Sequence, residues 1–92
     1  MRFKWVWGEG RTELKLVTPG AVHTHGYLEV FENGLTRNGT FTKTRVYNIR
    51  LHHTLTTDML DCELVDYVSL RKAMRALKET VTVLIIGRGY EV

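Results

Sequence analysis

The stretch from Ser69 to Ile86 constrains the fold of this 92-residue chain more than any other. Apolar residues recur every three or four positions from Leu70 to Leu77, and Ser69 is a favourable N-cap, so a helix is predicted over about 69–79. Between Thr80 and Ile86, apolar side chains fall on both sides of a period-two pattern, which predicts a strand in a sheet interior. Such a strand needs a cover on each face, and this helix supplies only one.

Upstream of this stretch, apolar and polar residues alternate in the manner of strands. The first strand carries Phe3, Trp5 and Trp7 on one side, and we interpret them as core because aromatic side chains dominate burial. The sequence therefore predicts an α+β fold in a single domain over 1–92. We expect an antiparallel sheet of four to five strands with one main helix packed on one face, in the order β-β-β-β-(short α)-α-β. The expected strands cover residues 3–7, 12–18, 27–32, 40–51 and 80–86.

Two Asn-Gly pairs follow the third expected strand, and each is a strong signal for a tight hairpin turn. If Asn38-Gly39 is the tip, residues 27–37 pair with residues 40–50 in a long ribbon. If Asn33-Gly34 is the tip, residues 35–39 form a loop or bulge. The sequence leaves both alternatives open.

Residues 54–68 also fit two structures. A helix with Thr57 as its N-cap would place acidic residues in its first turns, where the helix dipole favours them. A short acidic loop followed by a strand over Leu64–Val68 would suit the Val and Tyr content of that end. We favour a first helical turn or a loop near residues 57–63.

Charge is unevenly distributed along the chain, although the formal net charge is only +3. Residues 35–53 carry Lys and Arg but no acid, and residues 54–68 carry Asp and Glu but no base. The predicted helix is basic again. Two basic segments that flank an acidic one indicate an asymmetric surface potential, able to steer a charged partner.

Basic and aromatic residues interleave along the fourth expected strand. Phe41, Lys43, Arg45 and Tyr47 occupy alternate positions and so fall on one face of the expected strand. A sheet with this composition can stack bases on its aromatic rings and neutralise phosphates with its cations. On the predicted helix, cations recur one turn apart between Arg71 and Lys78, opposite the apolar side. We therefore predict a small non-enzymatic binding or regulatory protein that engages nucleic acid or a nucleoprotein complex. The candidate binding residues are Arg37, Phe41, Lys43, Arg45, Tyr47, Arg50, Arg71, Arg75 and Lys78.

A pair of histidines forms the second candidate site. On an extended backbone, His23 and His25 project to the same side, as metal binding requires. Preceded by Pro19-Gly20 and followed by Glu29, the pair resembles a fragment of the first metal motif of the cupin barrels. The Gly, Pro and His of the second cupin motif have no match downstream, so neither the cupin fold nor its metal is carried over, and no cofactor is expected. The candidate metal ligands are His23, His25, His52 and His53.

An enzyme is the main rival class. Cys62 lies close in sequence to His52, His53 and Asp58 or Asp61, so a cysteine and histidine pair is conceivable. A chain of this length leaves little material for a deep cleft, and we expect no enzymatic activity. The first alternative is a protein–protein inhibitor or adaptor, of the phage-type regulator kind, that blocks a partner surface. The second is a small metal-dependent enzyme that uses the histidines.

Cysteine content and hydropathy indicate the compartment. A single cysteine excludes an internal disulfide framework and fits a reducing environment. No apolar run reaches the roughly 18 residues of a membrane span. We therefore expect a cytoplasmic protein without a membrane partner. Nucleic acid or nucleoprotein is the expected partner, and a protein partner or a second copy in a homodimer is a further one.

Overall fold

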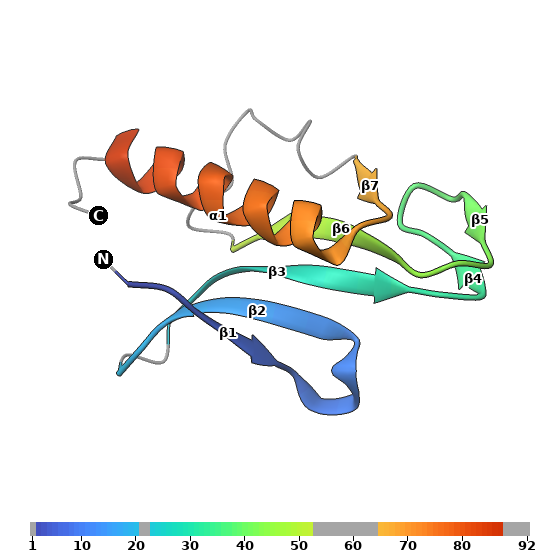
Figure 1. Ribbon diagram of the computed structural model, residues 1–92, viewed down its shortest axis with the longest axis horizontal. Coiled ribbons are helices and arrows are strands. Elements are labelled where there is room, and N and C mark those ends of the chain that lie inside the picture. The colour runs from blue at the N-terminus through green and yellow to red at the C-terminus, as the bar shows by residue number, and fades with distance from the viewer. Residues whose placement is uncertain (1, 21–22, 53–64, 88–92) are drawn as a thin grey trace.

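The protein forms a curled antiparallel sheet with one long helix on it; the computed structural model describes residues 2–20, 23–52 and 65–87 (Figure 1). Five strands pair antiparallel in the order β1-β2-β3-β6-β7, and β4 and β5 form a separate two-stranded sheet. This architecture confirms the predicted α+β class and the main helix on one sheet face. The elements are β1 (Lys4–Trp7), the 3₁₀ helix η1 (Glu9–Arg11), β2 (Glu13–Thr18), β3 (His23–Phe31), β4 (Gly34–Leu35), β5 (Phe41–Thr42), β6 (Val46–Leu51), β7 (Asp66–Tyr67) and α1 (Leu70–Gly87).

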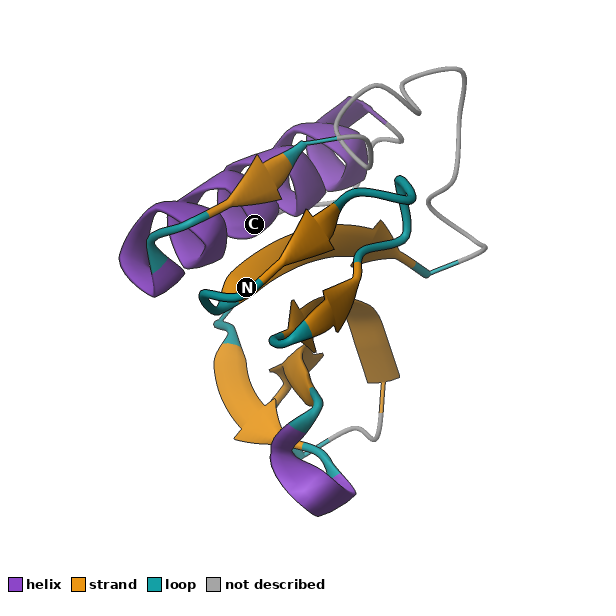
Figure 2. Cartoon of the chain, turned by 90° about the vertical axis from the view of Figure 1, so that its right-hand side faces the viewer, coloured by secondary structure: helices purple, strands orange, loops and turns teal. Residues whose placement is uncertain are grey.

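The hydrophobic core lies between α1 and one face of the sheet (Figure 2). Leu16, Leu28 and Ile49 contribute fully buried side chains from three adjacent strands, and Leu77 and Val81 contribute them from α1. Burial of each large aliphatic side chain stabilises the fold by roughly 1.5–3 kcal/mol relative to exposure, so these contacts hold α1 on this face. No helix in the described part of the chain is long and apolar enough to cross a membrane.

The aromatic residues near the N-terminus extend this core, as predicted. Trp5 pairs in register with Leu16, and Trp7 pairs with Leu14. Both tryptophans and Phe3 pack against the buried cluster while staying partly exposed. Strand alternation therefore places the polar positions of β1 and β2 on the other face of the sheet.

The predicted strand over Thr80–Ile86 is wrong, because α1 continues without a break to Gly87. Val81, Leu84 and Ile85 follow one another at helical spacing and are buried against the sheet. This burial outweighs the preference of β-branched residues for strands. Two threonine hydroxyls also donate to the carbonyl four residues earlier, at 2.8 and 2.7 Å. The strand that required two covers is therefore absent from the described residues.

The N-terminal end of α1 forms as the sequence predicts. The Oγ of Ser69 accepts a hydrogen bond from the backbone N of Lys72 at 3.3 Å, which is the contact of an N-cap with the third helical residue. The Ser69 carbonyl accepts from the backbone N of Ala73 at 3.0 Å. The cap satisfies backbone donors that would otherwise lack a helical partner.

Asn38-Gly39 is the hairpin tip, and the Asn33-Gly34 alternative is wrong. β3 and β6 pair with Tyr27 opposite Arg50, the register that a tip at 38–39 requires. Gly39 adopts φ 79°, and its backbone N donates to the Thr36 carbonyl at 3.0 Å. The ribbon is interrupted, however, because the pairing of Gly34 with Thr42 in the small sheet is shifted by one residue.

The same interruption divides the expected strand over 40–51 into β5 and β6. Between them, the Thr42 hydroxyl donates to the Thr44 carbonyl at 2.8 Å. Local bonds of this kind offer the backbone an alternative to the sheet ladder. The break lies inside the basic and aromatic stretch, so residues on its two sides need not share a face.

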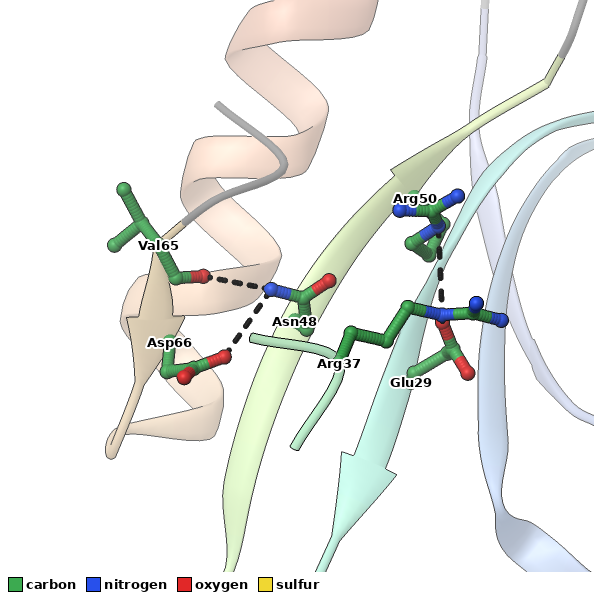
Figure 3. A network of polar contacts seen from close by, with 6 residues as sticks. All are labelled: Glu29, Arg37, Asn48, Arg50, Val65 and Asp66. Atoms are coloured by element: carbon green, nitrogen blue, oxygen red, sulfur yellow. Dashed lines mark hydrogen bonds and ion pairs between the residues drawn. The ribbon is translucent and has the colours of Figure 1, made fainter. Parts of the chain in front are cut away.

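The segment after β6 is described from Val65 onward, and the helical turn or loop predicted near 57–63 lies outside the described residues. Asp66 and Tyr67 form β7 opposite Asn48 and Tyr47, which supports the strand alternative at its C-terminal end. Asn48 is fully buried, and its Nδ2 donates to the Val65 carbonyl at 3.2 Å and to an Asp66 carboxylate oxygen at 3.1 Å (Figure 3). This side chain fixes β7 at the sheet edge.

Candidate nucleic-acid interface

The outer side of α1 carries four exposed cations, which we call the helix basic face: Arg71, Lys72, Arg75 and Lys78. Ala73 and Leu77 point the other way and are fully buried, so the cations face away from the sheet. None of the four forms an ion pair with another described residue. With a rise of about 1.5 Å per residue, cations four positions apart lie about 6 Å apart along the helix axis.

The predicted strand arginines, in contrast, have carboxylate partners. The Nε of Arg37 pairs with the Glu29 carboxylate, and the Nε of Arg50 lies 3.7 Å from the same carboxylate (Figure 3). Arg45 Nε pairs with Glu32 at 3.0 Å. The hydrogen bond to Glu32 is the main cause that raises the pKa of Arg45 above its usual value, so this group stays charged. A phosphate at these arginines would compete with carboxylates that are already in place.

The two aromatic residues of the predicted surface have different environments. Tyr47 is 7% exposed and belongs to the hydrophobic core, so its ring is not available for stacking. Its burial follows from alternation, because Ile49 on the same side of β6 is buried too. Phe41 is 59% exposed and lies opposite Leu35, which is also exposed, in the β4–β5 hairpin. Lys43 is exposed at the end of that hairpin.

The nine predicted residues do not form one surface. Arg50 lies between Ile49 and Leu51, which are buried beneath α1, so strand alternation places Arg50 on the opposite face of the sheet. We call this opposite face the open sheet face. Arg37 reaches it through the shared Glu29. The helix basic face therefore lies on one side of the molecule, and this arginine pair lies on the other.

Two residues of the open sheet face were not predicted from the sequence. Lys15 of β2 pairs in register with Tyr27 of β3, and Tyr27 pairs with Arg50 of β6. The available signal was the alternation of Leu14, Leu16 and Leu28, which assigns Lys15 and Tyr27 to the side away from the core. Their juxtaposition depends on strand register, which the sequence alone left open.

Three of the four candidate metal ligands form a cluster at one end of the sheet. The ring centroids of His23 and His25 are 4.7 Å apart, and those of His23 and His52 are 5.5 Å apart. His25 is buried at 5% exposure, contacts the Phe3 ring edge-on, and its Nε2 lies 2.6 Å from the Thr18 hydroxyl. Burial, and then the two neighbouring imidazoles, lower the pKa of His25. This desolvation favours a neutral imidazole.

The described residues contain no group of three or more His, Cys, Asp or Glu arranged to hold a metal ion. His53, Cys62, Asp58 and Asp61 lie outside the described residues, so the proposed cysteine and histidine pair stays a sequence hypothesis. No protein-family model matches this chain, and no curated protein or solved structure shows detectable similarity to it.

Proposed function

We propose that this protein is a small non-enzymatic regulator that binds nucleic acid, with the helix basic face as its phosphate contact. The supporting observation is that four exposed cations, from Arg71 to Lys78, have no carboxylate partner among the described residues. Cations that approach phosphates release condensed counterions, and this release supplies much of the affinity for a polyanion. No cofactor is required, and a cytoplasmic location is part of the same proposal.

The packing of α1 supports this assignment. Leu77 and Val81 anchor the helix to the sheet with no exposed area, so the cations project from a fixed backbone. Long side chains on a rigid element lose less freedom on binding than the same side chains on a mobile segment. The interface therefore combines cations that have no described carboxylate partner with a preorganised scaffold.

The candidate residues of the hairpin have a secondary place in the proposal. Phe41 is exposed, and Lys43 has no described ion pair. Arg37 and Arg45 are each paired with a glutamate. Any phosphate contact at those arginines has to displace a carboxylate, which reduces the gain.

A protein inhibitor or adaptor is the second candidate function, supported by exposed apolar residues on the same helix. Val83 and Ile86 lie three residues apart near the end of α1 and are 60% and 57% exposed. Together with the basic residues of the first turns, they make an outer surface that is cationic at one end and apolar at the other. A protein partner with an acidic and an apolar patch would fit that surface.

Fluorescence anisotropy with labelled duplex and single-stranded oligonucleotides, over a salt series, tests the proposal. We expect binding that weakens as salt rises. The variant Arg71→Glu/Arg75→Glu should reduce affinity at least tenfold and lower the log–log slope by about 0.7–0.9 for each phosphate that the variant no longer neutralises. The matched control Lys43→Glu/Arg45→Glu makes the same charge change on the hairpin and should have a smaller effect. If no probe binds near physiological salt, nucleic-acid binding is overturned and the protein-blocking candidate replaces it.

A further inference from the structure

The open sheet face carries an aromatic ring between two cations. Lys15, Tyr27 and Arg50 come from three adjacent strands and are cross-strand neighbours in the observed register. Side chains directly opposite one another on a sheet have Cβ atoms about 4.5–5.5 Å apart. The row is thus a half-buried tyrosine with a cationic side chain on each side.

A groove adjoins this row on the β1–β2 side. It has a volume of about 410 Å³, and Lys4 and Lys15 line it together with Val6 and Val17. Val6 is 39% exposed, so part of the apolar floor is accessible. A groove with apolar walls and lysine ammonium groups suits a flat, partly apolar ligand that carries a phosphate.

The acidic residues of this face do not cancel its positive charge. Glu29 is paired with Arg37 and Arg50, which offsets its carboxylate. The two groove lysines form no ion pair with a described residue. Cations therefore outnumber carboxylates on the face: Lys4, Lys15, Arg37 and Arg50 against Glu13, Glu29 and Asp66.

We propose that the open sheet face binds a single-stranded nucleic-acid segment, with one base stacked on Tyr27, one flanking phosphate on Lys15 and the other on Arg50, where it displaces the Glu29 carboxylate. The next base occupies the groove beside Val6 and Val17. This inference rests on the proposed function and adds a second contact and a strand preference to it. An exposed aromatic ring on a sheet selects single strands because their unstacked bases expose ring faces, whereas a duplex keeps its bases stacked on one another.

The position of the face sets the binding geometry. α1 covers the sheet face that carries Leu28 and Ile49, whereas Tyr27 and Arg50 lie on the other one. A short oligonucleotide cannot contact the open sheet face and the helix basic face at once. The single strand on Tyr27 is therefore a separate segment from the one held by α1, and each face should bind independently.

Binding of Tyr27→Leu to a short oligouridylate and to a duplex of equal length tests the inference. We expect affinity for the single strand to fall about 5- to 160-fold, the range that removal of one base stack produces, with duplex affinity unchanged. Tyr27→Phe keeps the ring and should restore single-strand binding. Phe41→Leu removes the exposed hairpin aromatic and should reduce single-strand affinity less than Tyr27→Leu does. Photocrosslinking to a 5-iodouridine oligonucleotide should give an adduct on Tyr27.

A second variant keeps the test valid if Tyr27→Leu does not fold. Lys15→Gln retains the ring and should lower the single-strand salt slope by about 0.7. Single-strand affinity that is unchanged in both Tyr27→Leu and Lys15→Gln overturns the inference, and so does a reduction in Phe41→Leu equal to that in Tyr27→Leu. In both cases, the proposed function is still supported if duplex binding depends on the helix basic face. Absence of binding to every probe overturns the proposed function itself.

Discussion

The helix basic face and the hairpin arginines have similar composition but different availability. Arg71 and Arg75 project from α1 without a described carboxylate partner, whereas Arg37 and Arg45 are held by Glu29 and Glu32. A row of cations in a sequence therefore does not by itself define a phosphate site. What matters is whether the fold supplies each cation with an internal anion, and this depends on strand pairing rather than on local composition.

Detaching α1 from the sheet should give the largest effect, because it removes the scaffold of the helix basic face. Leu77 is fully buried between α1 and the sheet, so Leu77→Ala should cost about 2–5 kcal/mol of the free energy of unfolding. Val83→Ala, at a 60% exposed position of the same helix, should change it by no more than about 0.5 kcal/mol. Urea unfolding of both variants gives the comparison, and equal costs would contradict the observed packing of α1.

The close approach of β3 to α1 offers a second test. A Cβ at Gly26 would lie 2.7 Å from the Arg50 carbonyl oxygen and 3.1 Å from Leu77 Cδ1. The carbonyl belongs to the paired strand and cannot yield cheaply, so Gly26→Ala should destabilise the fold by about 1–3 kcal/mol. A Cβ at Gly34 meets nothing closer than 4.0 Å, and Gly34→Ala serves as the control. Thermal unfolding that ranks these two variants in the reverse order would refute the predicted contact.

A fall in pH should separate stability from binding. Because the pKa of His25 is lowered in the folded state, the unfolded chain takes up this proton first as pH falls. The stabilising contribution of His25 is therefore full above about pH 6.5 and is lost as pH falls from there to the pKa of the folded state. Over this range the free energy of unfolding should change by at most about 1.4 kcal/mol per pH unit. Urea unfolding of wild type and His25→Gln across this pH range provides the measurement. The free energy of unfolding should fall less steeply with decreasing pH in His25→Gln than in wild type.

The helix basic face should respond differently to the same change in pH. Because α1 contains no histidine, duplex affinity measured while the protein is folded should be nearly constant over this range. If wild type and His25→Gln have the same pH dependence of stability, the assignment to His25 is incorrect.

Removal of the Glu29 carboxylate tests the contrast between the helix basic face and the arginines that are paired with glutamates. It should also change stability the least. Glu29→Gln releases Arg37 and Arg50 from their shared partner, at a cost of about 1 kcal/mol or less because Arg37 is half exposed. Because the neutral amide of this variant no longer offsets the charge of these arginines, single-strand affinity should rise severalfold and its salt dependence should steepen. The control Glu79→Gln lies beside the helix basic face and should leave the single-strand salt slope unchanged. A Glu29→Gln protein that binds single strands no better than wild type would show that the Glu29 carboxylate does not compete with phosphate.

The sequence predicts those parts of the fold whose signals are local. Ser69 caps the helix that it was expected to cap, and Asn38-Gly39, one of the two Asn-Gly pairs that predict a turn, forms the tip. The error at Thr80–Ile86 has a physical cause, since a continuous apolar run satisfies helical and strand periods equally well. Burial of Val81 against the sheet decided between them, and this is a tertiary contact.

The candidate site was harder to predict than the fold. Exposure of Arg71 and Arg75 follows from helical periodicity and was predicted. The position of Tyr47 in the core was also accessible from alternation with Ile49, but the basic and aromatic pattern grouped Tyr47 with the exposed Phe41. The row through Tyr27 depends on the pairing of three strands. The turn at Asn38-Gly39 sets Tyr27 opposite Arg50, but no local pattern sets Lys15 opposite Tyr27.

Amide chemical-shift mapping of the ¹⁵N-labelled protein during titration with a short DNA duplex tests the central claim most directly. The helix basic face predicts that the largest shifts fall between residues 70 and 78, decrease as salt is added, and disappear in Arg71→Glu/Arg75→Glu. Shifts confined to the hairpin between residues 41 and 45, or no shifts at any duplex concentration, would contradict the assignment of α1 as the phosphate contact.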